Sequence, residues 1–212
     1  MSFDAVFDAW CAFHESRGFA VRSFLNPPAS EAAIAEAEAR IGFALPEDLK
    51  SLWRRADGQQ DPFRIADPAP GRIVCPFFGS YDFASVAQSL TTYEGWKVIY
   101  DDAGERFADD FNGVIEVRGD DPVAREYWRP GWMPFSIDGG GNSYAVDLAP
   151  VTGGTYGQVI VIGSDEDVRR VLAPSITALL EDAIRRAPPL DPSQAAGEET
   201  VLVYFDLEDR GA

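Results

Sequence analysis

Histidine and cysteine are scarce in this chain of 212 residues, which holds one histidine, His14, and two cysteines, Cys11 and Cys75. A structural zinc site needs four ligands, and Cys11 and His14 have no second Cys/His pair to complete one. Two cysteines give no disulfide framework and suit a reducing compartment. His14 shares helical spacing with Phe7 and Trp10, which points it toward a core. We therefore expect neither a metal site nor a histidine-dependent catalytic centre.

Long apolar runs and catalytic motifs are also missing. No apolar run approaches the roughly 20 residues needed to span a bilayer. The N-terminus carries Asp4 and Asp8 and lacks the basic segment of a signal peptide, so we expect a cytoplasmic protein. The sequence has no P-loop, no strand followed by GxGxxG, no HExxH and no GxSxG. Carboxylate pairs are abundant, so spacing alone leaves glycosidase-like chemistry open. We expect a protein that is not an enzyme and needs no cofactor.

Basic residues are few: 18 Lys and Arg stand against 35 Asp and Glu, a net charge of −17. Such a surface repels nucleic acid and anionic membranes, and attracts basic proteins. Solubility alone is an equally good explanation of the composition. The charge is densest between 101 and 121, where eight acids and two bases give −6. We favour a solvated, mobile loop for this run. The alternative is a surface for a basic partner.

Aromatic residues near the acidic run add to the hypothesis of a surface for a basic partner. Trp96, Tyr127, Trp128 and Trp132 lie outside clear periodic stripes, and Trp and Tyr are enriched at binding hot spots. For Trp128 and Trp132 we favour packing over binding, because they precede a strand. The partner-binding hypothesis comprises eight residues: Trp96, Asp101, Asp102, Asp109, Asp110, Asp120, Asp121 and Trp128.

The stretch from Trp128 to Gly163 predicts an antiparallel meander. Met133–Ile137 and Ser143–Leu148 alternate between apolar and polar positions, and Val159–Ile162 is a run typical of a buried strand. The first two strands are joined by Asp-Gly-Gly-Gly-Asn at 138–142. Because glycine takes positive φ without steric cost, we favour a hairpin turn over an anion site there.

Helical signals flank the meander. Ser30 is a candidate N-cap, Gly42 a candidate stop, and Trp53 lies on an apolar stripe that predicts a core position. We predict helices near 31–56, 82–93 and 165–187, the last starting at Ser164. The fold class is then α+β, with a mainly antiparallel sheet of about four to six strands flanked by helices.

Motifs in this order resemble the SUKH superfamily. The meander WMPFSIDGGGNSYAVDLAP is followed by GQVIVIGSDED, an IGFALPEDL stretch begins at Ile41, and Asp57-Gly58-Gln59 follows that. The resemblance covers roughly Glu31 to Arg186. It implies a compact α+β domain that binds proteins and has no known catalytic centre. The superfamily contains fungal cell-wall assembly regulators and bacterial immunity proteins.

From these observations we predict one domain at 31–187. An N-terminal helical extension covers 1–30, and a linker with a short terminal strand or tail covers 188–212. We expect an immunity protein that neutralises a basic toxin, a nuclease in the first instance. The alternative is a regulatory scaffold like the fungal proteins. The partner is expected to be a basic protein, with no nucleic acid or membrane, and the chain a monomer or weak homo-oligomer.

Overall fold

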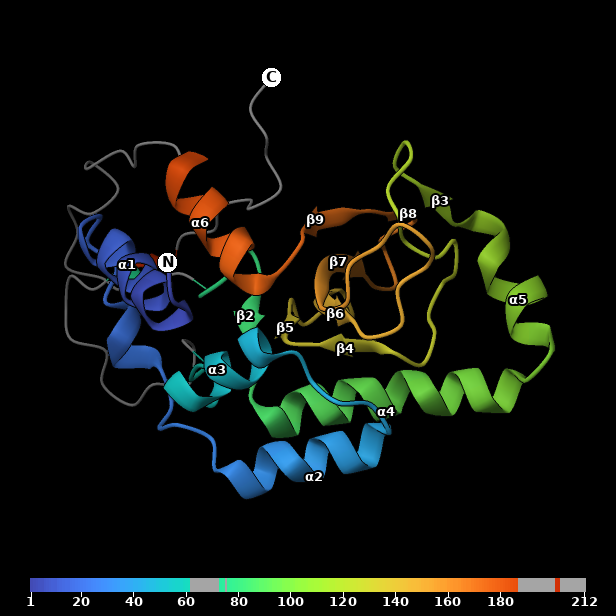
Figure 1. The fold of residues 1–212 in the computed structure, drawn as a ribbon, viewed down its shortest axis with the longest axis horizontal. Helices are drawn as coiled ribbons and strands as arrows, with labels where there is room; N and C mark the ends of the chain where they lie inside the picture. The colour runs from blue at the N-terminus through green and yellow to red at the C-terminus, as the bar shows by residue number, and fades with distance from the viewer. Residues whose placement is uncertain (62–72, 75, 187–200, 203–212) are drawn as a thin grey trace.

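A four-stranded antiparallel sheet lies at the centre of the computed structural model, which describes residues 1–61, 73–74, 76–186 and 201–202 (Figure 1). Its strands in spatial order are β4 (Trp132–Pro134), β6 (Ser143–Asp147), β7 (Gln158–Ile162) and β9 (Val171–Ala173). Helices flank this sheet, so the predicted α+β class and antiparallel meander are confirmed.

The β6–β7 hairpin forms the interior of the sheet. Its register runs from Ser143 opposite Ile162 to Asp147 opposite Gln158, and every residue of both strands is buried. The alternation in β6 predicted one polar, half-exposed face. Instead both faces are covered, and Ser143 and Asp147 are enclosed with their apolar neighbours.

The glycine-rich stretch at 138–142 is a turn, as predicted. Asp138 Oδ1 accepts the amide N–H groups of Gly140 at 2.7 Å and Asn142 at 2.9 Å. Gly141 has φ +100°, a conformation that costs glycine little. The carboxylate of Asp138 therefore satisfies the amides that an anion would need.

The predicted strand Met133–Ile137 is divided in two. After β4 the chain continues as β5 (Ser136–Ile137), which pairs antiparallel with β2 (Asp82–Phe83). The break comes at Phe135, a fully buried side chain. This second pairing joins the sheet to the start of the long helix α4 (Val86–Ala103).

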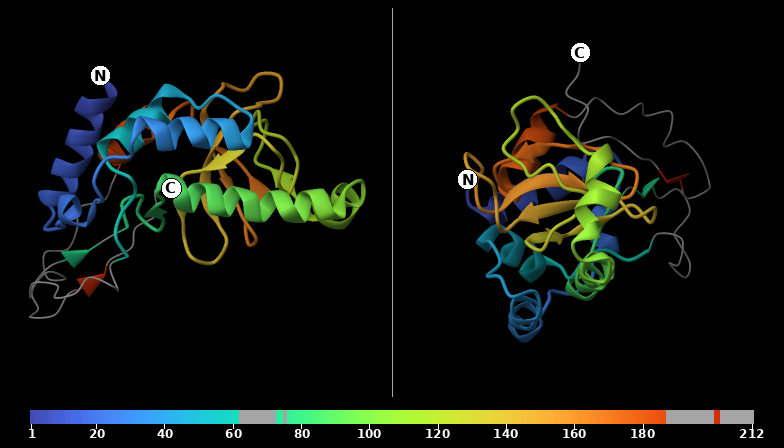
Figure 2. Two further views of the ribbon diagram at one scale, coloured as in Figure 1. Left: turned by 90° about the horizontal axis from the view of Figure 1, so that it is seen from below. Right: turned by 90° about the vertical axis from the view of Figure 1, so that its right-hand side faces the viewer.

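Six α-helices surround the sheet in the described part of the chain: α1 (Phe3–Glu15), α2 (Glu31–Ile41), α3 (Glu47–Arg55), α4 (Val86–Ala103), α5 (Arg106–Phe111) and α6 (Ile176–Arg186). Helices α1, α3 and α6 pack together at one end, and α4 packs along β4 with α2 beside it (Figures 1 and 2). A short 3-10 helix, η1 (Val21–Phe24), follows α1.

The local signals at the ends of α2 behave as predicted. Ser30 accepts the Ala33 amide at 3.1 Å, and Gly42 closes the helix with φ +77°. Trp53 on α3 is fully buried and donates its indole N–H to the carbonyl of Ala84.

The prediction of helical structure over 165–187 is wrong in its first half. Residues after Ser164 form β8 (Val168–Arg169) and β9, and α6 begins only after Pro174, with Ser175 accepting the Ala178 amide. Ser164 does not cap a helix; its hydroxyl donates to the carbonyl of Gly140. Val168 and Val171 suit a strand as well as a helix face, and the pairing of β8 with β3 (Glu116–Val117) and of β9 with β7 selects the strand.

The helix predicted at 82–93 is displaced. Residues 82–83 form β2, and α4 starts at Val86 with a capping box between Ser85 and Gln88. It then runs ten residues past Tyr93, to Ala103.

The Asp57-Gly58-Gln59 motif joins α3, β2 and α4. Asp57 Oδ1 accepts the Val86 amide at 2.8 Å. Gln59 Oε1 accepts the amides of Phe77 and Phe83, and its Nε2 donates to Asp82. A Cβ on Gly58 would lie 2.4 Å from the Ser85 nitrogen, so only glycine fits.

Two further strand pairs are short and parallel. In one, β1 (Ile73–Val74) pairs with β10 (Val201–Leu202); in the other, β3 (Glu116–Val117) pairs with β8. Strand β3 therefore lies inside the acidic run at 101–121. The linker predicted at 188–200 lies outside the described residues, and the 31–187 domain limit stays a prediction.

Candidate protein-binding surface

The acidic run at 101–121 is built mainly from regular elements. It comprises the end of α4, then α5, the 3-10 helix η2 (Asn112–Val114) and β3. These elements form the right-hand end of the molecule in Figure 1. The interpretation of this run as a solvated loop is therefore wrong.

Aromatic side chains hold this end of the molecule in place. Phe107 is buried and its ring lies 4.9 Å from Tyr100, 5.0 Å from Phe111 and 6.4 Å from Tyr127, measured between centroids. Tyr127 also meets Trp96 edge to face at 5.4 Å. Such pairs favour one fixed arrangement of the two helices.

A buried arginine fixes the segment that carries Tyr127. The guanidinium of Arg169 on β8 donates to the backbone carbonyls of Glu126, Tyr127 and Glu166. The side chain is fully buried, and burial lowers its pKa to about 10, so it stays charged at neutral pH. Carbonyl dipoles, with the rings of Tyr127 and Trp132, thus take the place of a carboxylate partner.

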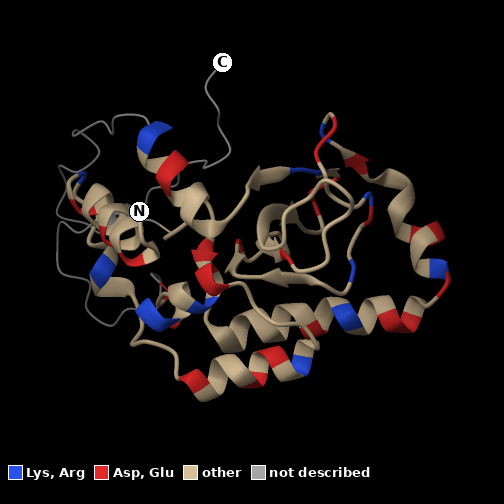
Figure 3. Ribbon diagram, viewed as in Figure 1, with Lys and Arg blue, Asp and Glu red and all other residues tan. Residues whose placement is uncertain are grey.

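Exposed carboxylates cover the outside of this framework. The acidic surface, as we use the term, comprises Asp101, Asp102, Glu105, Asp109, Asp110, Glu116 and Asp120, all of which are exposed. Figure 3 shows their elements along one end of the molecule. Few bases interrupt the surface, and Lys97 pairs with Asp101 at 2.5 Å.

Asp121 stands apart from the other predicted site residues. Its Oδ2 accepts from Arg118 at 2.9 Å and from the Val171 amide at 2.9 Å, while Arg118 also donates to the Val171 carbonyl. The residue is only partly exposed. Its carboxylate fastens the loop after β3 to the edge of the sheet.

The two tryptophans of the predicted site are not equally placed. Trp128 is only 1% exposed and packs on Tyr93 and Tyr100, so it belongs to the core and has almost no surface for a partner. Trp96 is half-buried on α4, where it supports the acidic surface from beneath through Tyr127.

Apolar residues on the same end were missed by the sequence reasoning. Val98 is 66% exposed, Ile99 44% and Val114 62%. A signal was present for the first two, since they face away from the stripe formed by Tyr93, Trp96 and Tyr100 on a continuous helix. The helix itself was not predicted beyond residue 93.

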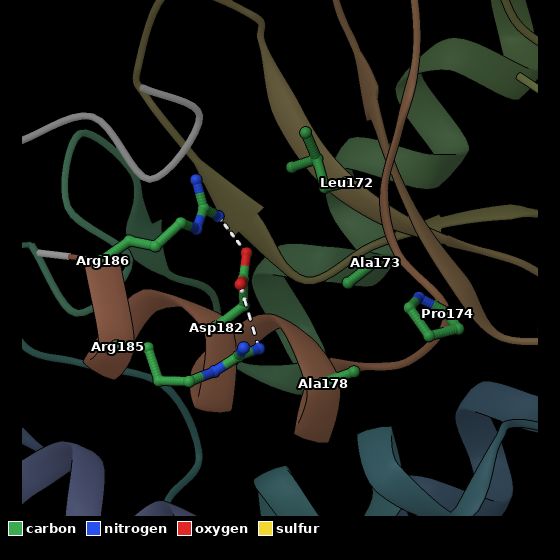
Figure 4. A pocket seen from close by; sticks show the side chains of 7 residues that line it. All are labelled: Leu172, Ala173, Pro174, Ala178, Asp182, Arg185 and Arg186. Carbon is green, nitrogen blue, oxygen red and sulfur yellow. Dashed lines mark hydrogen bonds and ion pairs between the residues drawn. The ribbon is translucent and has the colours of Figure 1, made fainter. Parts of the chain in front are cut away.

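A hollow of about 560 Å³ lies elsewhere, between the end of β9 and α6 (Figure 4). Arg185 and Arg186 both pair with Asp182 on its rim. The other described residues that line it are Leu172, Ala173, Pro174 and Ala178. These described lining residues provide no nucleophile and base for catalysis.

His14 is fully buried and meets Trp10 edge to face at 4.3 Å. Burial lowers its pKa to about 3, and burial raises the pKa of the Cys11 thiol to about 12. Both are therefore neutral members of the core. Among the described residues, no three His, Cys, Asp or Glu side chains are placed to hold a metal ion.

Among the helices of the described ranges, none combines the length and the hydropathy that a membrane span requires.

Known proteins that resemble this chain in sequence identify its family. A family model described as SMI1/KNR4 family (SUKH-1) matches residues 28–182. The yeast (Saccharomyces cerevisiae) "Cell wall assembly regulator SMI1" is 22% identical over 190 residues, covering 78% of this chain and 36% of that protein. The Neurospora crassa "Glucan synthesis regulatory protein" is 26% identical over 167 residues, covering 66% and 30%. The chain therefore spans about a third of the length of these relatives.

A shorter match is closer in sequence. The Schizosaccharomyces pombe "Cell wall biosynthesis/cell cycle regulator smi1" is 49% identical over 49 residues, which is 23% of this chain and 10% of that protein. The family model covers most of the chain and agrees with the resemblance seen in the meander and Asp-Gly-Gln motifs. The chain belongs to the SMI1/KNR4 family (SUKH-1).

Proposed function

We propose that this chain is a non-enzymatic regulatory module that binds a basic protein through the acidic surface. The proposal rests on the placement of seven exposed carboxylates over an aromatic foundation: five lie on helices or a strand, and Glu105 and Asp120 lie in the turns that follow α4 and β3. A surface held in one arrangement binds without an ordering cost, and its field speeds the approach of a positive partner.

The regulatory interpretation draws support from the relatives. Three of them bear names that describe regulation of cell-wall or glucan synthesis. This chain matches about a third of the first two, so the partners of those whole proteins are not carried over. We propose only the general role, a domain that docks another protein, and a cytoplasmic location.

Toxin neutralisation is the second candidate. The net charge of −17 favours it, because a nuclease must be positive where it meets phosphate, and an acidic inhibitor can occupy that site. The gene next to this one discriminates between the candidates. A large secreted toxin encoded there supports immunity, and its absence favours the regulatory role.

The experiment is recovery of a partner from lysate of the source organism, followed by association kinetics at low and high salt. We expect association to slow as salt rises, since charges further apart than about 8 Å are screened at physiological ionic strength. A test variant carries Asp101, Asp102, Asp109 and Asp110 changed to lysine.

The matched control reverses Asp4, Glu15, Glu31 and Glu36, exposed acids on α1 and α2. Four reversals of two charges each take the net charge from −17 to −9 in both variants. We expect only the test variant to lose association rate, by roughly tenfold or more at low salt. Equal rates in the two variants, or turnover of a small substrate without any partner, would contradict the proposal.

A further inference from the structure

Helix α4 projects beyond its neighbour α2. The two lie side by side, and Arg40 near the end of α2 pairs with Glu94 on α4 at 2.5 Å. Both Figure 1 and the left view of Figure 2 show the second half of α4 continuing past α2. Val98 is one turn beyond Glu94 on the same stripe, so the face that α2 covers continues as an open one.

That open face is apolar at its centre. Val98 is 66% exposed and Ile99 44%, and the two are adjacent on the helix. Exposed aliphatic side chains that share one face of a helix are typical of contact surfaces. Asp102 lies one turn after Val98, and Glu105 follows, so the apolar pair is bordered by carboxylates.

A glycine without an internal role lies on the same face. Gly95 is one turn before Ile99, inside a regular helix, where glycine is unfavourable compared with alanine. A Cβ at this position would meet no atom within 4 Å. Packing within the chain therefore does not require glycine here, but close approach by another backbone would.

We propose that Gly95, Val98 and Ile99 form a docking face for a basic amphipathic helix of another protein. Its aliphatic side chains lie on Val98 and Ile99, its backbone approaches Gly95, and its Lys and Arg side chains reach Asp102 and Glu105. The occupant is not a second copy of this chain, because two copies of a chain of net charge −17 repel each other. This inference rests on the proposed function and specifies the mode of binding.

The probe is a labelled synthetic peptide of about 18 residues with Leu on one helical face and Lys on the other. Fluorescence anisotropy gives its affinity for the full chain. The variant V98S/I99S removes the apolar pair without changing charge. The control V114S/V168S removes two other exposed valines, on η2 and β8. We expect about a tenfold loss of affinity for the first variant and no loss for the control.

A second variant separates docking from folding. Gly95→Gln should raise the thermal midpoint of unfolding, because glutamine is the better helix former, and it should lower the affinity for the peptide about tenfold by blocking close approach of the peptide backbone. A glycine with a purely structural role would not give these opposite effects.

The outcomes also separate this inference from the proposed function. If V98S/I99S binds the peptide as well as the native chain does, or the native chain does not bind at all, the docking face is wrong. If D101K/D109K/D110K, which spares Asp102 and Glu105, has no effect while V98S/I99S weakens binding, the docking face stands and the charge-based function fails. If only the charge reversal lowers the affinity for the peptide, the acidic surface stands as the binding site and the docking face is wrong.

Discussion

The meander and the acidic surface are opposite in composition, but both are fixed by buried contacts. In the meander, β6 and β7 are buried along their whole length, and their positions follow from strand pairing. At the acidic end the outward side chains are charged, while Phe107, Tyr127 and Trp128 beneath them belong to or pack on the core. A run of charge can therefore be the outer face of an ordered element rather than a solvated loop.

Removing Arg169 should have the largest effect, because it links β8 to the segment beneath the acidic surface. Arg169→Met would leave three part-buried backbone carbonyls without their donor, at a cost of about 4 kcal/mol in the free energy of unfolding. Urea denaturation measures this. Arg185→Met, at an exposed position on α6, is the control and should cost little. A loss below about 1 kcal/mol for Arg169→Met would show that the guanidinium is dispensable.

Phe107→Ala tests whether the acidic end unfolds with the meander. The ring is buried among Tyr100, Phe111 and Tyr127, so truncation should cost about 3 kcal/mol. We expect one cooperative transition with a lower midpoint. Two separate transitions, observed by near- and far-UV circular dichroism, would mean that the acidic end is an independent unit.

Gly58→Ala and Gly42→Ala form a matched pair, since both glycines have φ +77°. At Gly42 the added Cβ meets nothing within 4 Å, and only the left-handed backbone is penalised, by about 1 kcal/mol. At Gly58 the Cβ also collides with Ser85, so we expect the loss in the free energy of unfolding to be larger by about 2 kcal/mol. Equal losses in chemical denaturation would show that the Asp-Gly-Gln junction tolerates displacement.

Asp82→Asn should give the smallest effect, and a stabilising one. Burial raises the pKa of Asp82 to about 6, and the charge of Asp61 adds to the shift. Because the pKa of Asp82 in the folded state exceeds its ordinary value of 3.8, the stabilisation that its protonated carboxyl contributes is complete below about pH 4. This stabilisation is lost as the pH rises through about 6. Asparagine keeps an oxygen to accept from Gln59. We expect about 1 kcal/mol gained at pH 7.5, after allowing for partial exposure, and none at pH 4. A gain of the same size at both pH values would contradict this origin.

Features that depend on residues close together in the sequence were predicted correctly. The caps at Ser30 and Gly42, the turn after Asp138 and the buried stripe of Trp53 follow from local chemistry. Pairing between strands that are distant in the sequence was harder to predict. Residues 168–173 have an apolar spacing that suits a helix or a strand, and only their pairing with β3 and β7 selects the strand.

The candidate surface was predicted in part. The exposed acids were identified, but the spacing of Trp96 and Tyr100 on α4 was obscured by the acids around them. Trp128 was included because tryptophan is common in interfaces, whereas its contacts with Tyr93 and Tyr100 place it inside. Nothing local marks Arg169 as buried, since its partners are carbonyls about 40 residues away or on the adjoining turn.

Hydrogen exchange of the native chain tests the central claim, that the acidic surface is an ordered part of the domain. The amides of residues 97–103 lie in the half of α4 that projects past α2. We predict protection on the order of a thousandfold or more, approaching that of β6 and β7. Exchange of these amides at the rate of an unstructured chain, while β6 and β7 stay protected, would contradict the account.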